Sequence, residues 1–403
     1  MATDVLILNT AVLDLRSPDF GFADKLVGAG GLAKCPTSDM PPYSQEQIKS
    51  WIDLGCATAG GPGNTAPLVA RAGLKVAVGV NLGKGSFGGM DIQGRTFHDI
   101  LTANGVDMSS TFVHPSIPSG TTFIHEAPNN ERGGIAYFPN ANNDFDFEYF
   151  KKHIQRLQPV AVYYMYSGLS DRGDANGGKD LADFIAWCRK QGCITIVDSH
   201  TLTGNPQELI AKGASVPAYK LLVPLKEELD IFFTSADEAK MIRNTLDPEF
   251  RKMGHGDRDS IPNLLDFITE YLGAKGAGRP QLFGITVSNG AYARFIGAGS
   301  EMSEPVFCKS RFMAGEVIDL VGAGDSFRAG LITYIVSHSE EFRSGKINVE
   351  EAVQTGNLVA SLFIKASLHD RYGNIPNVKA LLDVVRGGRE YKNFNELMKA
   401  LGR

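Results

Sequence analysis

Short apolar runs alternate with amphipathic stretches along most of the chain. The apolar runs lie at residues 5–8, 75–78, 160–164, 194–197, 231–233 and 282–287, and several are apolar on both faces, as buried parallel strands are. Helical periodicity marks residues 181–190, 261–272 and 349–366 between and after them. This alternation predicts an α/β fold, with a doubly wound, mostly parallel sheet flanked by helices.

Two regions interrupt the alternation. Residues 17–47 are rich in Gly, Pro, Ser and Asp, and residues 110–145 hold two runs, 121–125 and 135–138, that are typical of antiparallel strands. A long irregular stretch in a compact protein is usually functional or mobile. We therefore expect one domain over residues 1–403, with a small β-rich lid from residues 14–50 and 108–145 and a helical tail at 385–403. A strand-built lid would also offer an edge for a homodimer.

Composition narrows the class of protein. Hydrophobic residues make up 43% of the 403 residues, so a large core can form. The net charge of −5 argues against a nucleic-acid binder and against an anionic membrane surface. No apolar run is long enough to cross a bilayer, and residues 1–15 read as a first strand rather than a signal peptide. Five scattered cysteines indicate reduced thiols and a cytoplasmic location.

The most informative motif is Gly322-Ala323-Gly324-Asp325, between an apolar lead-in and a helical pattern. Small residues let backbone N–H groups approach an anion, and a helix N-terminus favours negative charge. A carboxylate at this point makes sense if it takes a proton from a hydroxyl that attacks a phosphate. Asp is also a preferred helix cap. The residues alone leave the catalytic and the capping interpretations equally open.

A second small-residue turn, Gly60-Gly61-Pro62-Gly63-Asn64, opens another helical run. It is either an ordinary tight turn or a wall against which a polyhydroxylated ligand lies. In the second case Asn64 offers both a donor and an acceptor.

Three further polar residues have a functional and a structural interpretation. Glu238 follows the strand at 231–233 and would either hold a hydrated Mg²⁺ or belong to the acidic first turn of a helix, which the residues alone favour. Asp319 fits a salt-bridge partner better than a cation ligand. His200 follows another strand, where it would line a crevice or, as we favour, be an ordinary satisfied histidine.

One glycine pattern suggests a dinucleotide-binding site, but the residues around it argue against such a site. Residues 83–88 match the G-x-G-x-x-G pattern of dinucleotide sites and follow a strand. However, Gly89-Met90-Asp91 delays the helix, the strand is not the first of the chain, and no acidic residue ends a second strand about twenty residues on. We therefore do not expect a dinucleotide-dependent oxidoreductase.

Taken together, these motifs resemble those of one family. Residues 322–327, preceded by Asp319, resemble the C-terminal signature of the ribokinase-like carbohydrate kinases, the PfkB family. Other landmarks follow in the family's order: Asp14 after the first strand, the glycine turn at 60–66, the segment 89–95 and Asn357 in a late helix. The resemblance covers about residues 4–385.

The resemblance implies transfer of the γ-phosphate of ATP to a hydroxyl of a small molecule, with Mg²⁺ required. Carried over position by position, it gives Asp325 as the base and the backbone of Gly322, Ala323 and Gly324 as the anion hole. It assigns the substrate to Asp14, Gly60, Gly61 and Asn64, the nucleotide to Thr286, Ser288, Gly290 and Asn357, Mg²⁺ to Glu238 through water, and a monovalent cation such as K⁺ to the border of Asp319 and Val321.

The chain also departs from the family pattern. Ser235 replaces an asparagine, Leu320 replaces a threonine, and the turn at 286–290 is short, with Ser288 where a glycine is usual. A sugar is the leading substrate and a nucleoside is the alternative. A nucleoside base would need an aromatic slot, which could come from Phe20, Phe22, Phe112, Tyr137 and Phe138. The departures motivate another alternative, a catalytically impaired homologue that only binds ligands.

Overall fold

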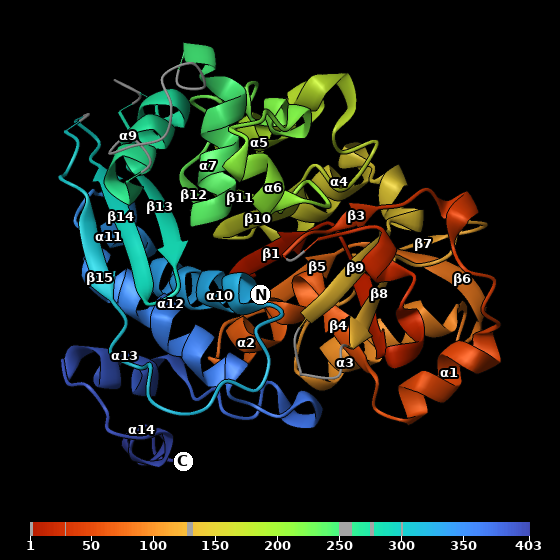
Figure 1. Ribbon diagram of the computed structural model, residues 1–403. Helices are drawn as coiled ribbons and strands as arrows, with labels where there is room; N and C mark the ends of the chain where they lie inside the picture. The colour runs from red at the N-terminus through yellow and green to blue at the C-terminus, as the bar shows by residue number, and fades with distance from the viewer. Residues whose placement is uncertain (1–2, 29, 127–131, 250–259, 275–277, 300) are drawn as a thin grey trace.

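The main sheet of the computed structural model has eight strands in the order β15-β14-β13-β12-β11-β10-β1-β5 (Figure 1). The structure describes residues 3–28, 30–126, 132–249, 260–274, 278–299 and 301–403, so residues 29 and 127–131 of the predicted lid lie outside the described part. The strands are β1 (Val5–Leu8), β5 (Val76–Gly79), β10 (Ala161–Ser167), β11 (Ile194–Ser199), β12 (Ile231–Ser235), β13 (Gln281–Val287), β14 (Gly290–Ile296) and β15 (Val306–Lys309).

All pairs from β5 to β13 are parallel, and β14 and β15 add an antiparallel edge that the sequence did not reveal. Along β1, Val5 and Ile7 enter one core while Leu6 and Leu8 enter a second core on the other face. Helices cover both faces, which confirms the predicted doubly wound α/β fold (Figure 1). One face carries α2 (Ala66–Arg71), α10 (Ala323–Ser337), α12 (Val349–Ile364) and α13 (Val378–Arg386); the other carries α4 (Phe147–Leu157), α5 (Lys179–Lys190), α7 (Ala236–Leu246) and α9 (Ile261–Leu272).

A second sheet has the order β3-β9-β8-β2-β4. Its strands are β2 (Val12–Ser17), β3 (Ala33–Lys34), β4 (Ala57–Gly60), β8 (Thr121–Glu126) and β9 (Arg132–Phe138). Strands β8 and β9 pair antiparallel, as predicted. Side chains alternate between its faces. Leu13, Leu15 and Phe123 enter a third core with Ile48 of α1 (Gln45–Asp53).

Three of the five aromatic residues proposed for the nucleoside slot belong to this third core or pack against it. They are Phe20, Phe22 and Phe138, which therefore lie on the covered face of the second sheet. Phe112 lies on β7 (Phe112–His114) and packs against Tyr149. Of the five aromatic residues proposed for the slot, Tyr137 lines the first of the two cavities described below, and the other four are not among the residues that line it.

The glycine pattern at 83–88 lies within and just beyond β6 (Asn81–Phe87), which pairs with β7. The next helix, α3 (Ile92–Ala103), begins only after its cap Asp91. The glycines therefore do not open a helix, which confirms the argument against a dinucleotide fingerprint.

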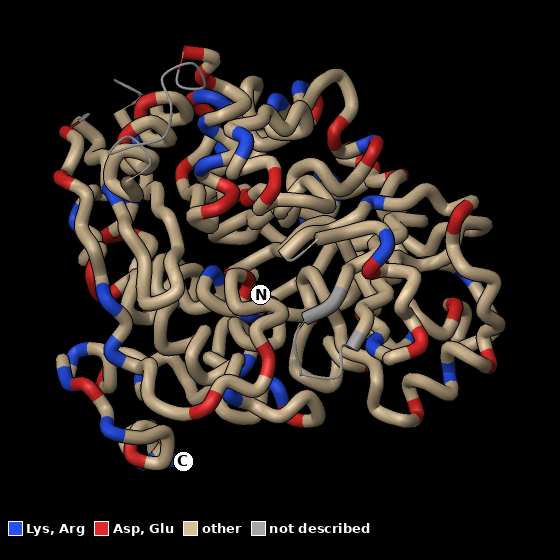
Figure 2. The backbone as a smooth tube through the Cα atoms, viewed as in Figure 1, with Lys and Arg blue, Asp and Glu red and all other residues tan. Residues whose placement is uncertain are grey.

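The remaining elements are short. They are α6 (Pro206–Ala211), α11 (Ser339–Arg343) and α14 (Phe394–Ala400), with 3₁₀ turns η1 (Pro18–Phe20), η2 (Ala23–Lys25), η3 (Thr37–Asp39), η4 (Gly61–Asn64), η5 (Asn140–Asp144), η6 (Ala175–Gly178), η7 (Pro217–Leu222) and η9 (Leu368–Asp370). Acidic and basic residues are interspersed along the backbone (Figure 2). Within the described ranges, none of the helices combines the length and apolar character that a membrane span requires.

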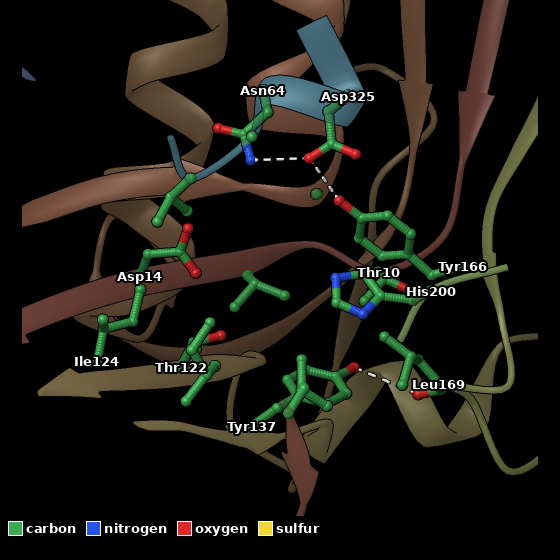
Figure 3. Close-up of a pocket in the computed structure, with 16 residues that line it drawn as sticks. Thr10, Asp14, Asn64, Thr122, Ile124, Tyr137, Tyr166, Leu169, His200 and Asp325 are labelled. Carbon is green, nitrogen blue, oxygen red and sulfur yellow. Dashed lines mark hydrogen bonds between the residues drawn. The ribbon is translucent and has the colours of Figure 1, made fainter. Parts of the chain in front are cut away.

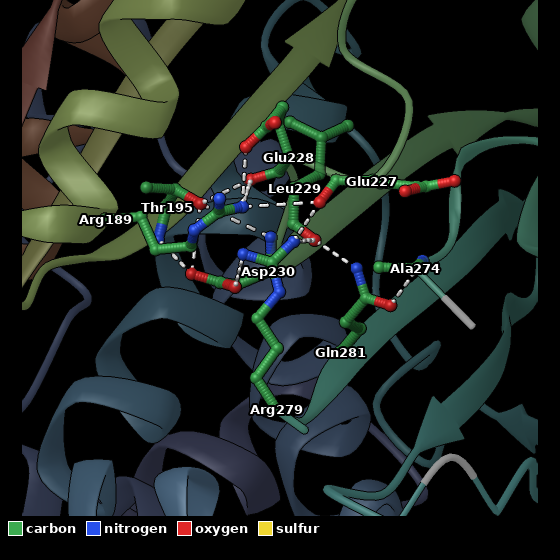
Figure 4. A network of polar contacts seen from close by, with 9 residues as sticks. All are labelled: Arg189, Thr195, Glu227, Glu228, Leu229, Asp230, Ala274, Arg279 and Gln281. Carbon is green, nitrogen blue, oxygen red and sulfur yellow. Dashed lines mark hydrogen bonds and ion pairs between the residues drawn. The ribbon is translucent and has the colours of Figure 1, made fainter. Parts of the chain in front are cut away.

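A buried polar network fixes the strands at their amino-terminal ends (Figure 4). Asp230, just before β12, accepts hydrogen bonds from the backbone N–H and the hydroxyl of Thr195 on β11, at 2.9 and 3.0 Å. Its other oxygen lies 3.2 Å from Arg279 Nη1. Gln281 at the start of β13 donates to the Leu229 carbonyl and accepts from the Ala274 N–H. The network therefore ties β11, β12 and β13 together.

Removing the carboxylate from this network should destabilise the fold. We expect Asp230→Ala to lower the free energy of unfolding by about 3–5 kcal/mol, because Arg279 would keep a buried charge without its partner. Chemical denaturation measures the change. Asp171→Ala is the control, since Asp171 pairs with Lys34 while 68% exposed, and it should cost less than about 1 kcal/mol. Equal losses in the two variants would contradict the role given to the network.

Candidate active site

Two adjoining cavities lie at the carboxyl ends of the parallel strands. The first, of about 90 Å³, is lined by Tyr166 of β10 and by His200 after β11. The second, of about 210 Å³, is lined by Thr286 of β13 and by residues of α10 and α12. The start of α10 borders both cavities: Gly322 and Asp325 line the first, and Ala323 and Gly324 line the second.

Asp325 is 7% exposed and lies in the first turn of α10 (Figure 3). Its Oδ2 accepts hydrogen bonds from Asn64 Nδ2 at 3.1 Å and from the Tyr166 hydroxyl at 2.6 Å. The N-cap position belongs to Gly322, so the capping interpretation of Asp325 was wrong. The carboxylate lines the first cavity instead, with two donors holding one of its oxygens.

Tyr166 is a site residue that the sequence reasoning missed. Its backbone is left-handed, with φ of 62°, and its side chain is buried. Burial and then the neighbouring Asp325 raise the pKa of the phenol well above its usual value, so the hydroxyl stays protonated and donates. The ring of His200 packs edge-on against it, with centroids 4.7 Å apart, and His200 lines the cavity as the crevice interpretation proposed. The position of Tyr166 at the end of a buried strand was the available signal.

A buried ion pair between Arg328 and Asp198 lies next to Asp325 and Tyr166. Arg328 Nη1 lies 3.2 Å from Asp198 Oδ2 and 3.7 Å from Asp325 Oδ1, and Arg328 Nη2 donates to the Phe233 carbonyl. Asp198 Oδ1 accepts the Tyr166 N–H at 2.8 Å. Burial raises the pKa of Asp198 to about 7, although Arg328 opposes the shift. Asp198 and Arg328 thus fix Tyr166 and Asp325 relative to each other.

The opposite wall of the first cavity is the inner face of the second sheet. The strand register places Asp14 of β2 beside Thr122 of β8, and Thr122 beside Tyr137 of β9. All three line the cavity (Figure 3). Burial raises the pKa of Asp14 to about 6, while the charges of Arg16 and Arg371 and a hydrogen bond from Thr122 oppose the shift.

The glycine turn at residue 60 fits closely around this wall. A Cβ on Gly60 would lie 2.5 Å from Asp14 Oδ2, so only glycine leaves the carboxylate room there. Gly61 and Asn64 line the first cavity, whereas Gly60 is not among its lining residues and lies close to the Asp14 carboxylate. The turn therefore brings the strand β4 and the start of η4 against the site.

The four residues predicted for the nucleotide all line the second cavity: Thr286, Ser288, Gly290 and Asn357. The first three belong to the β13–β14 hairpin, in which Val287 pairs with Gly290. Asn357 Nδ2 lies 3.3 Å from the Cys308 carbonyl and from Gln354 Oε1. The rest of the lining is largely apolar and includes Val317, Leu320, Phe327, Ala360 and Ile364.

Glu238 completes a capping box at the start of α7. Its Oε2 accepts from the Ser235 N–H at 2.9 Å and from the Thr234 hydroxyl at 2.8 Å, and Ser235 Oγ accepts the Glu238 N–H. The first-turn interpretation is therefore confirmed, and Ser235 has a structural role as the cap. Glu238 is not among the described residues that line the two cavities. Across the described ranges, His, Cys, Asp and Glu form no group of three or more that could hold a metal ion.

Asp319 lies in a cluster of arginines. Its Oδ2 is 2.9 Å from Arg16 Nη2 and 3.2 Å from Arg371 Nη2, and its Oδ1 accepts the Val321 N–H at 3.0 Å. The salt-bridge interpretation of Asp319 is thereby confirmed.

A doubly wound sheet with two adjoining cavities at its carboxyl edge, separated by a glycine-rich helix start, defines a ribokinase-like α/β protein. The family comparison agrees, since the model of the pfkB family carbohydrate kinases matches residues 52–252 and 299–369. The chain belongs to this family of carbohydrate kinases, whose members are phosphotransferases acting on sugar or nucleoside hydroxyls.

Solved structures share the fold over nearly the whole chain. An Anopheles gambiae adenosine kinase in complex with P1,P4-di(adenosine-5) tetraphosphate has a TM-score of 0.62 at 16% identity, covering 94% of this chain and 99% of that one. A Xylella fastidiosa fructokinase with bound ATP has a TM-score of 0.61 at 16% identity, covering 96% of this chain and 99% of that one. An adenosine kinase from Sinorhizobium meliloti has a TM-score of 0.58 at 18% identity, covering 96% of this chain and 100% of that one. Among curated protein sequences the search gave no match. At these identities the likeness establishes the fold.

Proposed function

We propose that this chain transfers the γ-phosphate of ATP to a hydroxyl of a small molecule, with a sugar as the leading substrate. The observation that carries the proposal is the position of one helix start between two cavities. Gly322 and Asp325 face the first cavity, and Ala323 and Gly324 face the second. A phosphoryl group passing between two bound ligands would have to pass this point.

In this proposal Asp325 takes the proton of the attacking hydroxyl. Asn64 and Tyr166 donate to Asp325 Oδ2, so Oδ1, which lies 3.7 Å from Arg328 Nη1, is the oxygen proposed to receive that proton. Asp14 and Asn64 orient the other hydroxyls of the substrate, because a carboxylate and an amide match their donors and acceptors. The protein then contributes alignment and charge neutralisation rather than a covalent step.

The backbone at residues 322–324 is proposed to stabilise the negative charge of the transferred phosphoryl. It forms the start of α10, where the helix dipole and N–H groups without helical partners favour anions, and where the Ala323 N–H donates to the Leu320 carbonyl at 3.1 Å. Mg²⁺ bound to the nucleotide would neutralise phosphate charge when present. Glu238 caps α7 and is not among the residues that line the two cavities, so it would reach the ion only through water, which suits an ion that keeps most of its own waters.

The second cavity is proposed to hold the nucleotide. Its apolar lining suits a flat purine ring, and Asn357, Ser288 and Thr286 supply polar groups at its border. Leu320, which departs from the family pattern, lies in this lining. Its apolar side chain is compatible with a ring contact.

A nucleoside is the second candidate substrate, and one observation favours it. Opposite Asp325, the first cavity has an apolar side formed by Leu32, Ile124, Ile135, Leu169 and the ring of Tyr137. A sugar leaves this side uncovered, whereas a nucleoside base would pack on it. ATP consumption measured across a panel of sugars and nucleosides separates the two: a higher kcat/KM for nucleosides would select the alternative.

The catalytically impaired alternative was motivated by three departures. Ser235 has a structural role as a helix cap, and the short turn at 286–290 is a tight hairpin that still borders the second cavity. These observations support an active enzyme. ATP binding without turnover on any compound of the panel would favour the impaired homologue.

We also infer how the chain is organised around the site. The second sheet would act as a lid on a single ribokinase-like domain over residues 1–403, with 385–403 as a helical tail. A homodimer through the lid would use an edge of this sheet, because its outer face is covered by the third core. No pair of the five cysteines, all of which lie in the described ranges, forms a disulfide, which supports the expected cytoplasmic location.

The pH dependence should report on Asp14. Because its pKa is raised to about 6, Asp14 is ionised at pH 7 and becomes protonated as the pH falls through 6. We expect kcat/KM for the acceptor to fall by about tenfold per pH unit below that value, since a protonated carboxyl loses its acceptor strength. Asp198, with a pKa of about 7, also titrates nearby. Asp14→Asn should therefore lose the step near 6, and a step that persists in this variant would contradict the assignment.

A further inference from the structure

The family resemblance assigns a monovalent cation to the border of Asp319 and Val321. In this chain, an arginine side chain occupies that position. Arg371, after η9, is 4% exposed and extends its guanidinium into that position. Arg371 Nη2 donates to the Val321 carbonyl at 2.8 Å and to Asp319 Oδ2 at 3.2 Å. Its guanidinium carbon lies 4.4 Å from the centre of the Phe363 ring. A fixed positive charge thus contacts both oxygens that would bind the ion.

The carboxylate oxygens of Asp319 also accept hydrogen bonds from two other groups. Arg16 Nη2 donates to the same Oδ2 at 2.9 Å, and Oδ1 accepts the Val321 N–H. A K⁺ ion needs several oxygen ligands, and here the carboxylate and the carbonyl already bind a cation that the chain itself supplies. The residues present therefore do not fit a metal ion at this position.

A second internal cation holds the other end of the same segment. Lys365 Nζ donates to the carbonyls of Phe312 and Ala314, at 2.8 and 2.7 Å. Between them, the Ile364 carbonyl accepts the N–H groups of Ile318 and Asp319. The segment from 312 to 321, which leads into the glycine turn, is thus fastened to the end of α12 and the residues after it.

The contact with Val321 bears directly on the proposed anion hole. Val321 precedes Gly322, the N-cap of α10, and the guanidinium that binds its carbonyl orients the peptide that begins the turn. A cation beside this carbonyl also adds positive potential where phosphate charge would develop. Arg371 contacts no atom of the reaction, so it acts as a positioning residue.

We propose that Arg371 is a built-in replacement for the monovalent cation, so that this kinase works without K⁺ or Na⁺. The proposal rests on the proposed function for its kinetic consequence, but not for its structural one. At equal ionic strength, turnover should be the same in KCl, NaCl and tetramethylammonium chloride. A rate several-fold higher in K⁺ would overturn the proposal.

A measurement without turnover keeps this test separate from the test of function. The thermal midpoint of the ligand-free protein should not depend on whether K⁺ or tetramethylammonium is present. A K⁺-specific stabilisation of the unmodified protein would overturn the proposal even if no substrate is found. Absence of turnover in every salt would count against the proposed function alone.

Removing the guanidinium gives the positive test. Arg371→Ala should lower turnover by about 10–100-fold, the loss expected for a charged hydrogen bond that supports the transition state. Methylguanidinium should restore part of the rate, whereas N-methylurea, which is neutral and of the same shape, should not. Arg294→Ala is the matched control, because Arg294 is also buried and paired, with Asp266, but on β14. Rescue by both compounds, or equal rescue of Arg294→Ala, would contradict the role of Arg371.

Discussion

Asp325→Asn is expected to lower turnover by about 10²–10⁴-fold, the contribution of a positioned general base. The variant keeps the shape of the side chain but removes the acceptor of the hydroxyl proton. Asn64 and Tyr166 can still donate to the amide oxygen, so the local structure should persist. Initial rates at saturating ATP measure the loss, and nucleotide titration should show that ATP still binds.

The control for this variant is Asp230→Asn. Asp230 is also a buried, paired aspartate, but it lies before β12 at the opposite end of the strands from the two cavities. It should change stability and leave turnover per folded molecule unaltered. Undiminished turnover in Asp325→Asn would refute the proposed role of this carboxylate.

Gly322→Ala is expected to lower turnover by about 10²–10³-fold, the range seen when an anion-stabilising donor is lost. Gly322 has φ of 87°, which residues with a Cβ rarely adopt. Its Cβ would also lie 2.8 Å from Asn64 Cγ and 3.0 Å from Phe363 Cε1. The turn would have to move, and with it the N–H groups and the Asn64 side chain that holds Asp325.

Gly345→Ala separates this effect from backbone strain. Gly345 has φ of 74°, and the nearest atom to its added Cβ is the Ala298 nitrogen at 3.7 Å. Both variants carry a similar backbone strain of about 1–2 kcal/mol from the positive φ. Gly322→Ala adds the close contacts with Asn64 and Phe363, so it should lose more stability than Gly345→Ala. Only Gly322→Ala should lose turnover. Equal kinetic losses would show that strain, and not the geometry of the anion hole, determines the result.

The sequence predicts those parts of the protein whose structure follows from a local pattern of residues. The alternation of Val5 and Ile7 with Leu6 and Leu8 records a strand buried on both faces, and the structure has two cores there. The glycine turns at 60 and 322 are also visible in the sequence as clusters of small residues, although the atoms that need the room belong to the distant residues Asp14, Asn64 and Phe363. Strand β2, in contrast, follows β1 after a short connection and joins the other sheet, which its apolar pattern does not reveal.

The residues that the sequence did not reveal depend on long-range contacts. Tyr166 and Asp325 are 159 positions apart, and Arg371 reaches Val321 from 50 positions away. Each reads in the sequence as an ordinary aromatic or charged residue. The placement of Asn357 and Thr286 on one cavity came from the family resemblance, since no spacing rule joins them.

In the proposed reaction, the γ-phosphate passes from ATP to a bound hydroxyl at Asp325. The most direct measurement follows ADP and phosphorylated product together, for the unmodified protein and Asp325→Asn, on the panel of sugars and nucleosides. We expect equal amounts of ADP and product for at least one polyhydroxylated compound, and loss of both in Asp325→Asn. Product formed at an undiminished rate by Asp325→Asn, or ADP released without a phosphorylated acceptor, would contradict it.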